Sequence, residues 1–253
     1  MKNIFIEGIQ GAGKSTLTNS MAKDHPDYKV CREGDYNPVE LAWCTWMDEA
    51  EYEAMLQRYS AIADEIKART VKAAGHYIVM YTRILTDIPG FHKDLENYEI
   101  YNGRRTVEEL KEIVLSRYAG FGERGYIFEC SFFQNIVEDL ILFHQLSDDE
   151  IVDFYRQLFK LVDKEAFELI YLYSEDIAEN IRIIRKERCD NEGNEMWYPL
   201  MLGYLAESPY GKTHGFKDFD DMIRHFEHRQ RLEMRIIKEV LGKNAKVVPA
   251  KSM

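Results

Sequence analysis

Hydrophobic and polar positions in this chain follow two patterns that take turns along the sequence. Short apolar runs, typical of buried strands, lie at Lys2–Gly8, Tyr28–Arg32, His76–Ile84, Tyr126–Ser131, Phe167–Tyr173 and Ala245–Pro249. Apolar residues at three- and four-residue spacing predict helices at Lys14–Asp24, Asp48–Ala74, Thr106–Tyr118, Phe132–Leu146, Ser147–Lys164, Ser174–Arg188 and Asp218–Leu241. Strands that alternate with helices predict an α/β protein with a doubly wound parallel sheet.

Several predicted helices have residues at their ends that commonly begin or stop a helix. Thr106 with Glu109, and Ser147 with Glu150, have the spacing of a capping box. Gly75 follows the longest apolar stripe and is expected to be its C-cap.

Two stretches interrupt this alternation. Leu85–Arg105 carries turn signals, and Tyr98–Tyr101 within it reads as half of a hairpin. Cys189–Lys217 is expected to be irregular. We therefore interpret residues 1–253 as a single domain with an insertion at about 85–124 and a lid region at about 182–217.

The loop after the first strand carries the clearest chemical signal. Gly8 through Ser15 reads G-x-x-x-x-G-K-S, the pattern of a phosphate-binding P-loop. Its glycines let backbone N–H groups turn toward an anion, and the following helix adds the positive end of its dipole. The nucleotide-binding residues expected from this motif are Gly8, Gly11, Ala12, Gly13, Lys14, Ser15 and Thr16.

The P-loop defines both the ligand and the expected fold. Lys14 is expected to contact the β- and γ-phosphates of ATP, and the Ser15 hydroxyl to ligate Mg²⁺. The spacing G-x-x-G-x-G differs from the dinucleotide fingerprint G-x-G-x-x-G. The expected fold class is α/β, the three-layer fold of P-loop NTPases, with a parallel sheet of about five strands, helices on both faces, a helical lid and insertions.

The composition of the chain argues against nucleic acid and membranes as binding partners. The net charge of −11 argues against a broad surface for nucleic acid or anionic membranes, since both need an excess of Lys and Arg. No apolar run approaches the roughly 20 residues of a membrane helix. The four cysteines form no C-x-x-C pair, and the chain begins directly with a strand, so a reduced cytoplasmic protein is expected. A homodimer is left open.

The absence of two motifs argues against two classes of P-loop protein, the switch GTPases and the hydrolytic ATPases. The sequence contains no guanine-reading N-K-x-D, and no predicted strand ends in the paired acids of a hydrolytic ATPase. A kinase needs a carboxylate for the acceptor, a carboxylate near Mg²⁺ and basic residues that neutralise the transferred charge. Glu33 follows one predicted strand, and Glu129 lies in the polar end of another. The helix 174–188 ends in a basic cluster: Arg182, Arg185, Lys186 and Arg188.

The order of these motifs resembles the P-loop nucleoside and nucleotide kinases, specifically the deoxynucleoside kinase and thymidylate kinase group. The resemblance rests on Ile6–Thr16, Arg32-Glu33, the pair Gln57 and Tyr59, Phe128–Ser131 and the Arg-rich stretch Asn180–Arg188. It implies that Glu33 acts as the acceptor-side base, that Gln57 reads a base and that Arg182, Arg185 and Arg188 belong to the lid.

This sequence departs from that group at one strand end. Cys130 stands where the group has an arginine, and Arg83, which also closes a predicted strand, is our candidate to replace it. The substrate residues expected are thus Glu33, Gln57, Tyr59 and Arg83, the catalytic ones Lys14, Glu33, Arg182, Arg185 and Arg188, and the metal ligands Ser15 and Glu129.

These observations lead to one main hypothesis and two alternatives. The main hypothesis is an ATP- and Mg²⁺-dependent phosphotransferase acting on a small-molecule acceptor, a nucleoside or nucleotide. The first alternative is a nucleotide-binding regulatory protein without an acceptor, favoured by Cys130. The second is an antibiotic-type small-molecule kinase on the same fold.

Other conspicuous side chains are expected to be structural. His225 and His228 lie three residues apart on a helix but have no third metal ligand nearby in sequence. Trp43 and Trp46 are expected in the core or in a pocket wall.

Overall fold

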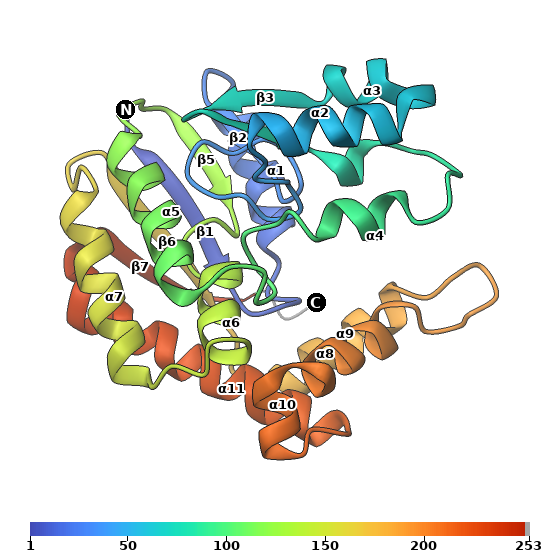
Figure 1. Ribbon diagram of the computed structural model, residues 1–253. Coiled ribbons are helices and arrows are strands. Elements are labelled where there is room, and N and C mark those ends of the chain that lie inside the picture. Colours follow the sequence, from blue (N-terminus) through green and yellow to red (C-terminus); the bar gives the residue numbers. More distant parts are fainter. Residues whose placement is uncertain (251–253) are drawn as a thin grey trace. The chain divides into compact units, whose positions relative to one another are not determined.

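The computed structural model describes residues 1–250 and divides into two compact units (Figure 1). The sheet unit consists of Met1–Val30 and the chain from Gly122 onward, and the inserted unit is Cys31–Phe121. Each is described by itself. The expectation of a single domain stays a prediction.

A five-stranded sheet forms the centre of the fold, in the order β2-β5-β1-β6-β7. Its strands are β1 (Asn3–Gly8), β2 (Lys29–Cys31), β5 (Tyr126–Glu129), β6 (Phe167–Tyr173) and β7 (Ala245–Pro249). The pairs β1–β5, β1–β6 and β6–β7 are parallel. Every residue of β1 is buried, as expected for a strand covered on both faces.

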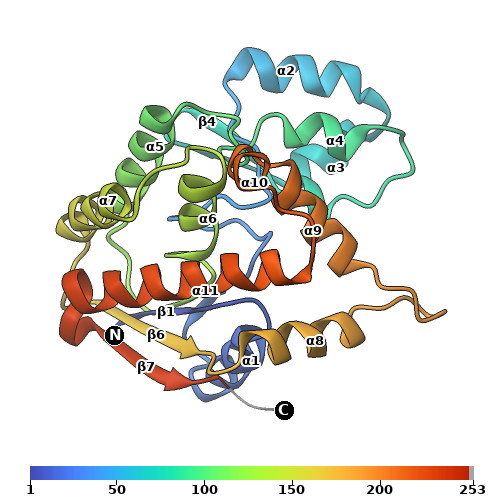
Figure 2. The same cartoon turned by 90° about the horizontal axis from the view of Figure 1, so that it is seen from below.

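Helices cover both faces of this sheet. In Figure 2, α1 (Lys14–Asp24) lies on one face, whereas α6 (Gln134–Leu142), α7 (Asp148–Leu161) and α11 (Phe219–Ile236) lie on the other. A π-helical turn, Ile237–Leu241, and a 3-10 turn, Gly242–Asn244, follow α11. The α/β class and the parallel sheet of five strands are therefore confirmed.

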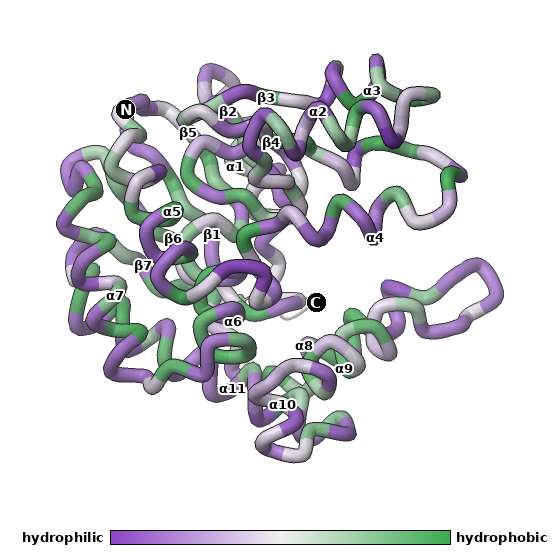
Figure 3. The backbone as a smooth tube through the Cα atoms, viewed as in Figure 1, coloured by the Kyte–Doolittle hydropathy of each residue, from purple (hydrophilic) through white to green (hydrophobic). Residues whose placement is uncertain are grey.

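The segment Cys189–Lys217 is more regular than its sequence predicts. After α8 (Ile177–Glu187) and a hydrophilic loop (Figure 3), it forms α9 (Trp197–Glu207) and α10 (Pro209–His214). The prediction of irregular structure was wrong because α9 is apolar on most sides and shows no helical stripe. Pro199 lies in its first turn, where proline is tolerated.

The inserted unit differs most from the sequence prediction. The predicted helix Asp48–Ala74 is instead α2 (Glu49–Arg58), a 3-10 turn Ser60–Ile62, α3 (Ala63–Ala68) and strand β3 (Thr70–Ala73). Strand β4 (His76–Val79) pairs antiparallel with β3, outside the parallel sheet.

Left-handed backbone at the β3–β4 turn explains this error. Ala74 and Gly75 have φ of 50° and 80°, the pair of left-handed residues that a two-residue hairpin turn requires. Gly75 is thus a turn residue and not a helix C-cap. The predicted strand His76–Ile84 ends at Val79, and Arg83 lies in the 3-10 turn Tyr81–Arg83.

Two further helices complete the inserted unit, α4 (Phe91–Glu96) and α5 (Val107–Gly120). The capping boxes predicted at Thr106 for α5 and at Ser147 for α7 are both confirmed. Tyr98–Tyr101 is not part of any strand that the structure describes, so the predicted half-hairpin was wrong.

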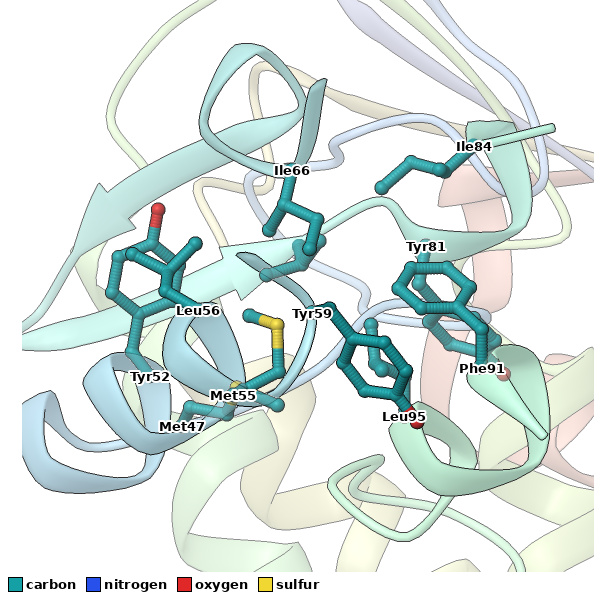
Figure 4. Close-up of a cluster of buried hydrophobic side chains, with 11 residues drawn as sticks. Met47, Tyr52, Met55, Leu56, Tyr59, Ile66, Tyr81, Ile84, Phe91 and Leu95 are labelled. Atoms are coloured by element: carbon teal, nitrogen blue, oxygen red, sulfur yellow. The ribbon is translucent and has the colours of Figure 1, made fainter. Parts of the chain in front are cut away.

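The apolar stripe predicted in 48–74 nevertheless forms the core of the inserted unit (Figure 4). Tyr52, Met55, Leu56, Tyr59 and Ile66 pack together with side chains from β4 and α4. The hydrophobic positions were therefore assigned correctly although the helix breaks at Tyr59.

Stacked aromatic rings hold the centre of the sheet unit. Phe5 on β1 lies between Phe128 and Phe167 on the neighbouring strands, with ring centroids 4.6 and 4.7 Å away. Phe132 meets the same ring edge-on at 5.8 Å.

Replacement of Phe5 tests this core. We expect Phe5→Ala to lower the free energy of unfolding by about 3–5 kcal/mol, because it removes a fully packed ring and leaves a cavity. Phe5→Leu should cost distinctly less. Urea unfolding followed by circular dichroism measures both, and equal losses would contradict the central role of the ring stack.

Candidate phosphate-binding site

The loop between β1 and α1 has the backbone conformation that its glycines predict. Gly11 and Gly13 have φ of 79° and 92°, and Gly13 is the residue that precedes α1. The Ala12 N–H donates to the Ile9 carbonyl at 3.1 Å, which closes the turn. The first residues of α1 are Lys14, Ser15 and Thr16, so the N–H groups at the start of this helix belong to the loop motif.

The Lys14 side chain lies against this loop. Its ammonium donates to the carbonyl of Gly8 at 2.8 Å and to that of Ile9 at 3.0 Å. Only 8% of the residue is exposed. The sequence-predicted lysine is thus held at the loop by two backbone acceptors.

Ser15, in the first turn of α1, meets Glu129 at the end of β5. The Ser15 hydroxyl donates to Glu129 Oε1, and Glu129 is buried at the end of β5. A hydroxyl and a carboxylate are oxygen ligands of the kind Mg²⁺ takes in combination with phosphates. Within residues 1–250, no group of three or more His, Cys, Asp and Glu side chains could hold a metal by itself. The donor set therefore fits a metal shared with a phosphate ligand.

Glu7, which sequence reasoning missed, anchors the neighbouring helix. Its carboxylate is fully buried and accepts the Phe132 N–H at 2.6 Å and the Gln134 N–H at 3.4 Å. Burial raises the pKa of Glu7 to about 7, and the hydrogen bond from the Phe132 N–H and the charge of Lys14 oppose this in part. Its position inside a buried apolar strand was the available signal.

Helix α8 packs directly on the loop. A Cβ at Gly11 would come within 2.6 Å of Ile184 Cδ1 and 3.2 Å of the Asn180 carbonyl. Close approach of α8, as well as the positive φ, therefore requires glycine at this position.

The basic residues of α8 contact other parts of the lid region. Arg185 pairs with Glu195 through two hydrogen bonds of 2.8 and 3.0 Å, and its guanidinium carbon lies 3.9 Å from the ring centroid of Tyr198. Arg182 pairs with Glu179 at 3.3 Å. Arg188 lies over the Trp197 ring at 5.6 Å. Their predicted contacts with phosphate stay a prediction.

In the inserted unit, Glu33 and Arg83 come together. The Arg83 guanidinium donates to the Glu33 carbonyl at 3.2 Å and pairs with Asp35 at 2.8 Å. The Glu33 carboxylate accepts the Trp43 indole N–H at 3.1 Å. Trp43 is 46% exposed rather than in the core, whereas Trp46 is buried.

Gln57 and Tyr59 occupy different environments. Gln57 is exposed on α2. Tyr59 is buried in the core of the inserted unit, where its hydroxyl donates to Asp94, and Arg58 pairs with the same carboxylate at 2.6 Å. The two side chains therefore point to different surroundings.

Two buried carboxyls in the inserted unit have no counterpart among the predicted site residues. Burial raises the pKa of Glu40 to about 8, and a hydrogen bond from the Ala42 N–H opposes this only in part. Burial also raises the pKa of Glu99 to about 7, and Tyr81 and Asn102 donate to its carboxylate. Glu40 stands in an apolar stretch, which was the only sequence signal.

The two helical histidines have structural partners. His225 is buried and bonds Glu138 at 2.6 Å, and His228 bonds Asp148 at 2.8 Å.

None of the helices that the structure describes is both long and apolar enough to cross a membrane.

Comparisons with known proteins add little. No family model and no curated protein matches the chain. Among solved structures, the chain is similar to D-glycerate 3-kinase from Cryptococcus neoformans at 10% sequence identity, with a TM-score of 0.31. The match covers all of this chain and 87% of that chain.

The buried carboxyl of Glu40 makes stability depend on pH. A folded-state pKa near 8, above the unfolded value of 4.5, means that the folded chain binds the extra proton between these values. The cost of the buried carboxyl therefore grows as pH rises from 4.5 to about 8 and is fully present above pH 8. We expect Glu40→Gln to raise the free energy of unfolding at pH 8.5 by about 1 kcal/mol or more beyond its effect at pH 5.5, because most of the cost of the carboxyl builds up between these two pH values.

Urea unfolding at the two pH values measures this difference. Glu53→Gln, at an exposed position of α2, is the matched control and should be neutral at both. A Glu40→Gln protein that is less stable at pH 8.5 would contradict the argument.

Proposed function

We propose that this protein is an ATP-dependent phosphotransferase that moves the γ-phosphoryl group of Mg·ATP to a small acceptor, a nucleoside or nucleotide. The observation that carries the proposal is the loop 8–15, where left-handed glycines, the buried Lys14 and the Ser15–Glu129 pair meet at the end of β1. This arrangement supports binding of a triphosphate with its metal.

On the donor side, the chain's own residues have separate tasks. The N–H groups of Gly11, Ala12 and Gly13 and of the first turn of α1, including Thr16, would bind phosphate oxygens. Lys14 would exchange its two carbonyl acceptors for the β- and γ-phosphates. Ser15 and Glu129 would hold Mg²⁺, which when bound neutralises charge on the phosphates.

The lid arginines would neutralise the charge of the transferred group. Arg185 now binds the Glu195 carboxylate in a bidentate manner, and a phosphate presents the same geometry to a guanidinium. Engagement of a triphosphate by Arg185 would therefore replace Glu195, whereas Arg182 and Arg188 would leave weaker contacts with Glu179 and Trp197.

On the acceptor side, Glu33 would orient or deprotonate the acceptor hydroxyl. Arg83 supports this role because it fixes the Glu33 backbone and Asp35 at the same time. Gln57 is exposed and would contact the acceptor. Tyr59, with its hydroxyl on Asp94, would shape the end of α2.

A nucleotide-binding regulatory protein without an acceptor is the second candidate. It is favoured by Cys130 and by the partners that Arg185 and Arg182 already have within the sheet unit. Such a protein would bind ATP but transfer phosphate to no small molecule.

The first experiment separates these functions. We expect the purified protein to bind Mg·ATP by calorimetry and to phosphorylate a member of a nucleoside and nucleotide panel. Lys14→Met should weaken ATP binding at least about tenfold, because a charged hydrogen bond to phosphate is lost. Lys23→Met, at the end of α1, is the matched control.

Each outcome of this experiment has a distinct meaning. ATP binding with an inert panel supports the regulatory protein, and activity on an aminoglycoside panel supports an antibiotic-type kinase. A protein that does not bind ATP overturns the proposal.

Glu33→Gln tests the acceptor side. The amide oxygen can still accept the Trp43 indole N–H, so the fold should be retained. We expect the turnover number to fall about 10²- to 10⁴-fold with unchanged ATP affinity, as for loss of a general base. Steady-state kinetics beside Glu53→Gln measure this, and full turnover would remove Glu33 from the mechanism.

A further inference from the structure

The carbonyl of Gly8 has two cationic donors from opposite ends of the chain. Lys14 Nζ lies 2.8 Å from this oxygen, and Arg229 Nη2 of α11 lies 3.5 Å from it. The shorter contact is a normal hydrogen bond, and the longer one is at the limit of such a bond. The position itself requires glycine, since a Cβ there would lie 2.6 Å from the backbone oxygen of Leu172.

Arg229 is held in place by buried carboxylates. The guanidinium is completely buried, Nη1 donates to Glu138 of α6, and Nε lies 3.1 Å from Glu233 Oε1. Tyr171 of β6 donates to Glu233, and His225 bonds Glu138. The planar group thus has one orientation, in which its remaining nitrogen points at the P-loop.

Glu138 is the carboxyl of this cluster that the neighbouring cations keep charged. Burial alone would raise the pKa of Glu138, but the charges of His225 and Arg229 outweigh this effect and lower it to about 2. A buried carboxylate that stays charged fixes its guanidinium partner, because separating them would leave both without a counter-ion.

We propose that Arg229 is a positioning residue that takes over the Gly8 carbonyl when Lys14 turns to the phosphates of a bound triphosphate. A buried carbonyl that loses its donor carries the full cost of desolvation. The Arg229 guanidinium lies beside the same oxygen and donates to it once Lys14 has left. Binding of the triphosphate therefore does not leave the Gly8 carbonyl without a donor. The loop then keeps its shape while its lysine changes partners.

This inference rests on the proposed function and makes a specific prediction about coupling. In an otherwise wild-type protein, Arg229→Lys keeps the buried positive charge but loses the guanidinium nitrogen that reaches the Gly8 carbonyl. ATP affinity should therefore fall about tenfold. In a Lys14→Met protein the carbonyl depends on Arg229 both with and without ATP. There, adding Arg229→Lys should leave ATP affinity unchanged.

Calorimetric titration of Mg·ATP into the wild type, the two single variants and the double variant measures this cycle. Arg231 is exposed on the same helix, so Arg231→Gln is the matched control and should leave ATP affinity unchanged. If Arg229→Lys does not fold, as judged by circular dichroism, Arg229→Gln with Glu138→Gln replaces it, because this pair removes one cation and one carboxylate together.

The outcomes are distinguishable. Equal loss of affinity in both backgrounds means a merely structural role for Arg229 and overturns the inference, as does no loss in the wild-type background. A wild type that fails to bind Mg·ATP overturns the proposed function and this inference with it.

Discussion

The ammonium of Lys14, held against the carbonyls of Gly8 and Ile9, is the interaction on which the sheet unit depends. The charge of this largely buried cation acts on two buried carboxyls: burial raises the pKa of Glu7 and of Glu233, and Lys14 offsets part of that effect. Helices α6 and α11, far apart in sequence, are thereby tied to the P-loop through backbone N–H groups and through Arg229.

The inserted unit follows a similar principle on a smaller scale. Glu40 and Glu99 are buried carboxyls with raised pKa, satisfied by an amide N–H and by a phenol. Such groups reduce stability at neutral pH, which the apolar packing around α2, β4 and α4 offsets. Glu33 is oriented differently, since an exposed indole and a paired guanidinium fix it near the surface of its own unit.

Sequence patterns predicted local structure well where nearby residues suffice to define it, as in a glycine-rich loop, a capping box or an apolar strand. The strand–loop–helix at 3–24, the capping boxes at Thr106 and Ser147, and the strands β6 and β7 lie where their residues predict them. Prediction failed at Asp48–Ala74, where one long helix was expected. Two short helices followed by a hairpin strand can place the same hydrophobic residues in the core as one continuous helix. Prediction failed again at α9, because an apolar helix has no periodicity to detect.

By itself, the sequence determined that a P-loop follows a buried strand, since glycines, a lysine and a serine at fixed spacing need only the local backbone to form the loop. Tertiary structure alone decided which side chains stand around it. Glu129 and Arg229 reach the loop from distant parts of the chain, and Glu138 in turn holds Arg229. Of these residues only Glu129 was predicted from the sequence. The physical reason is burial: a charge inside a fold must find its partner in space, wherever that partner lies in the sequence.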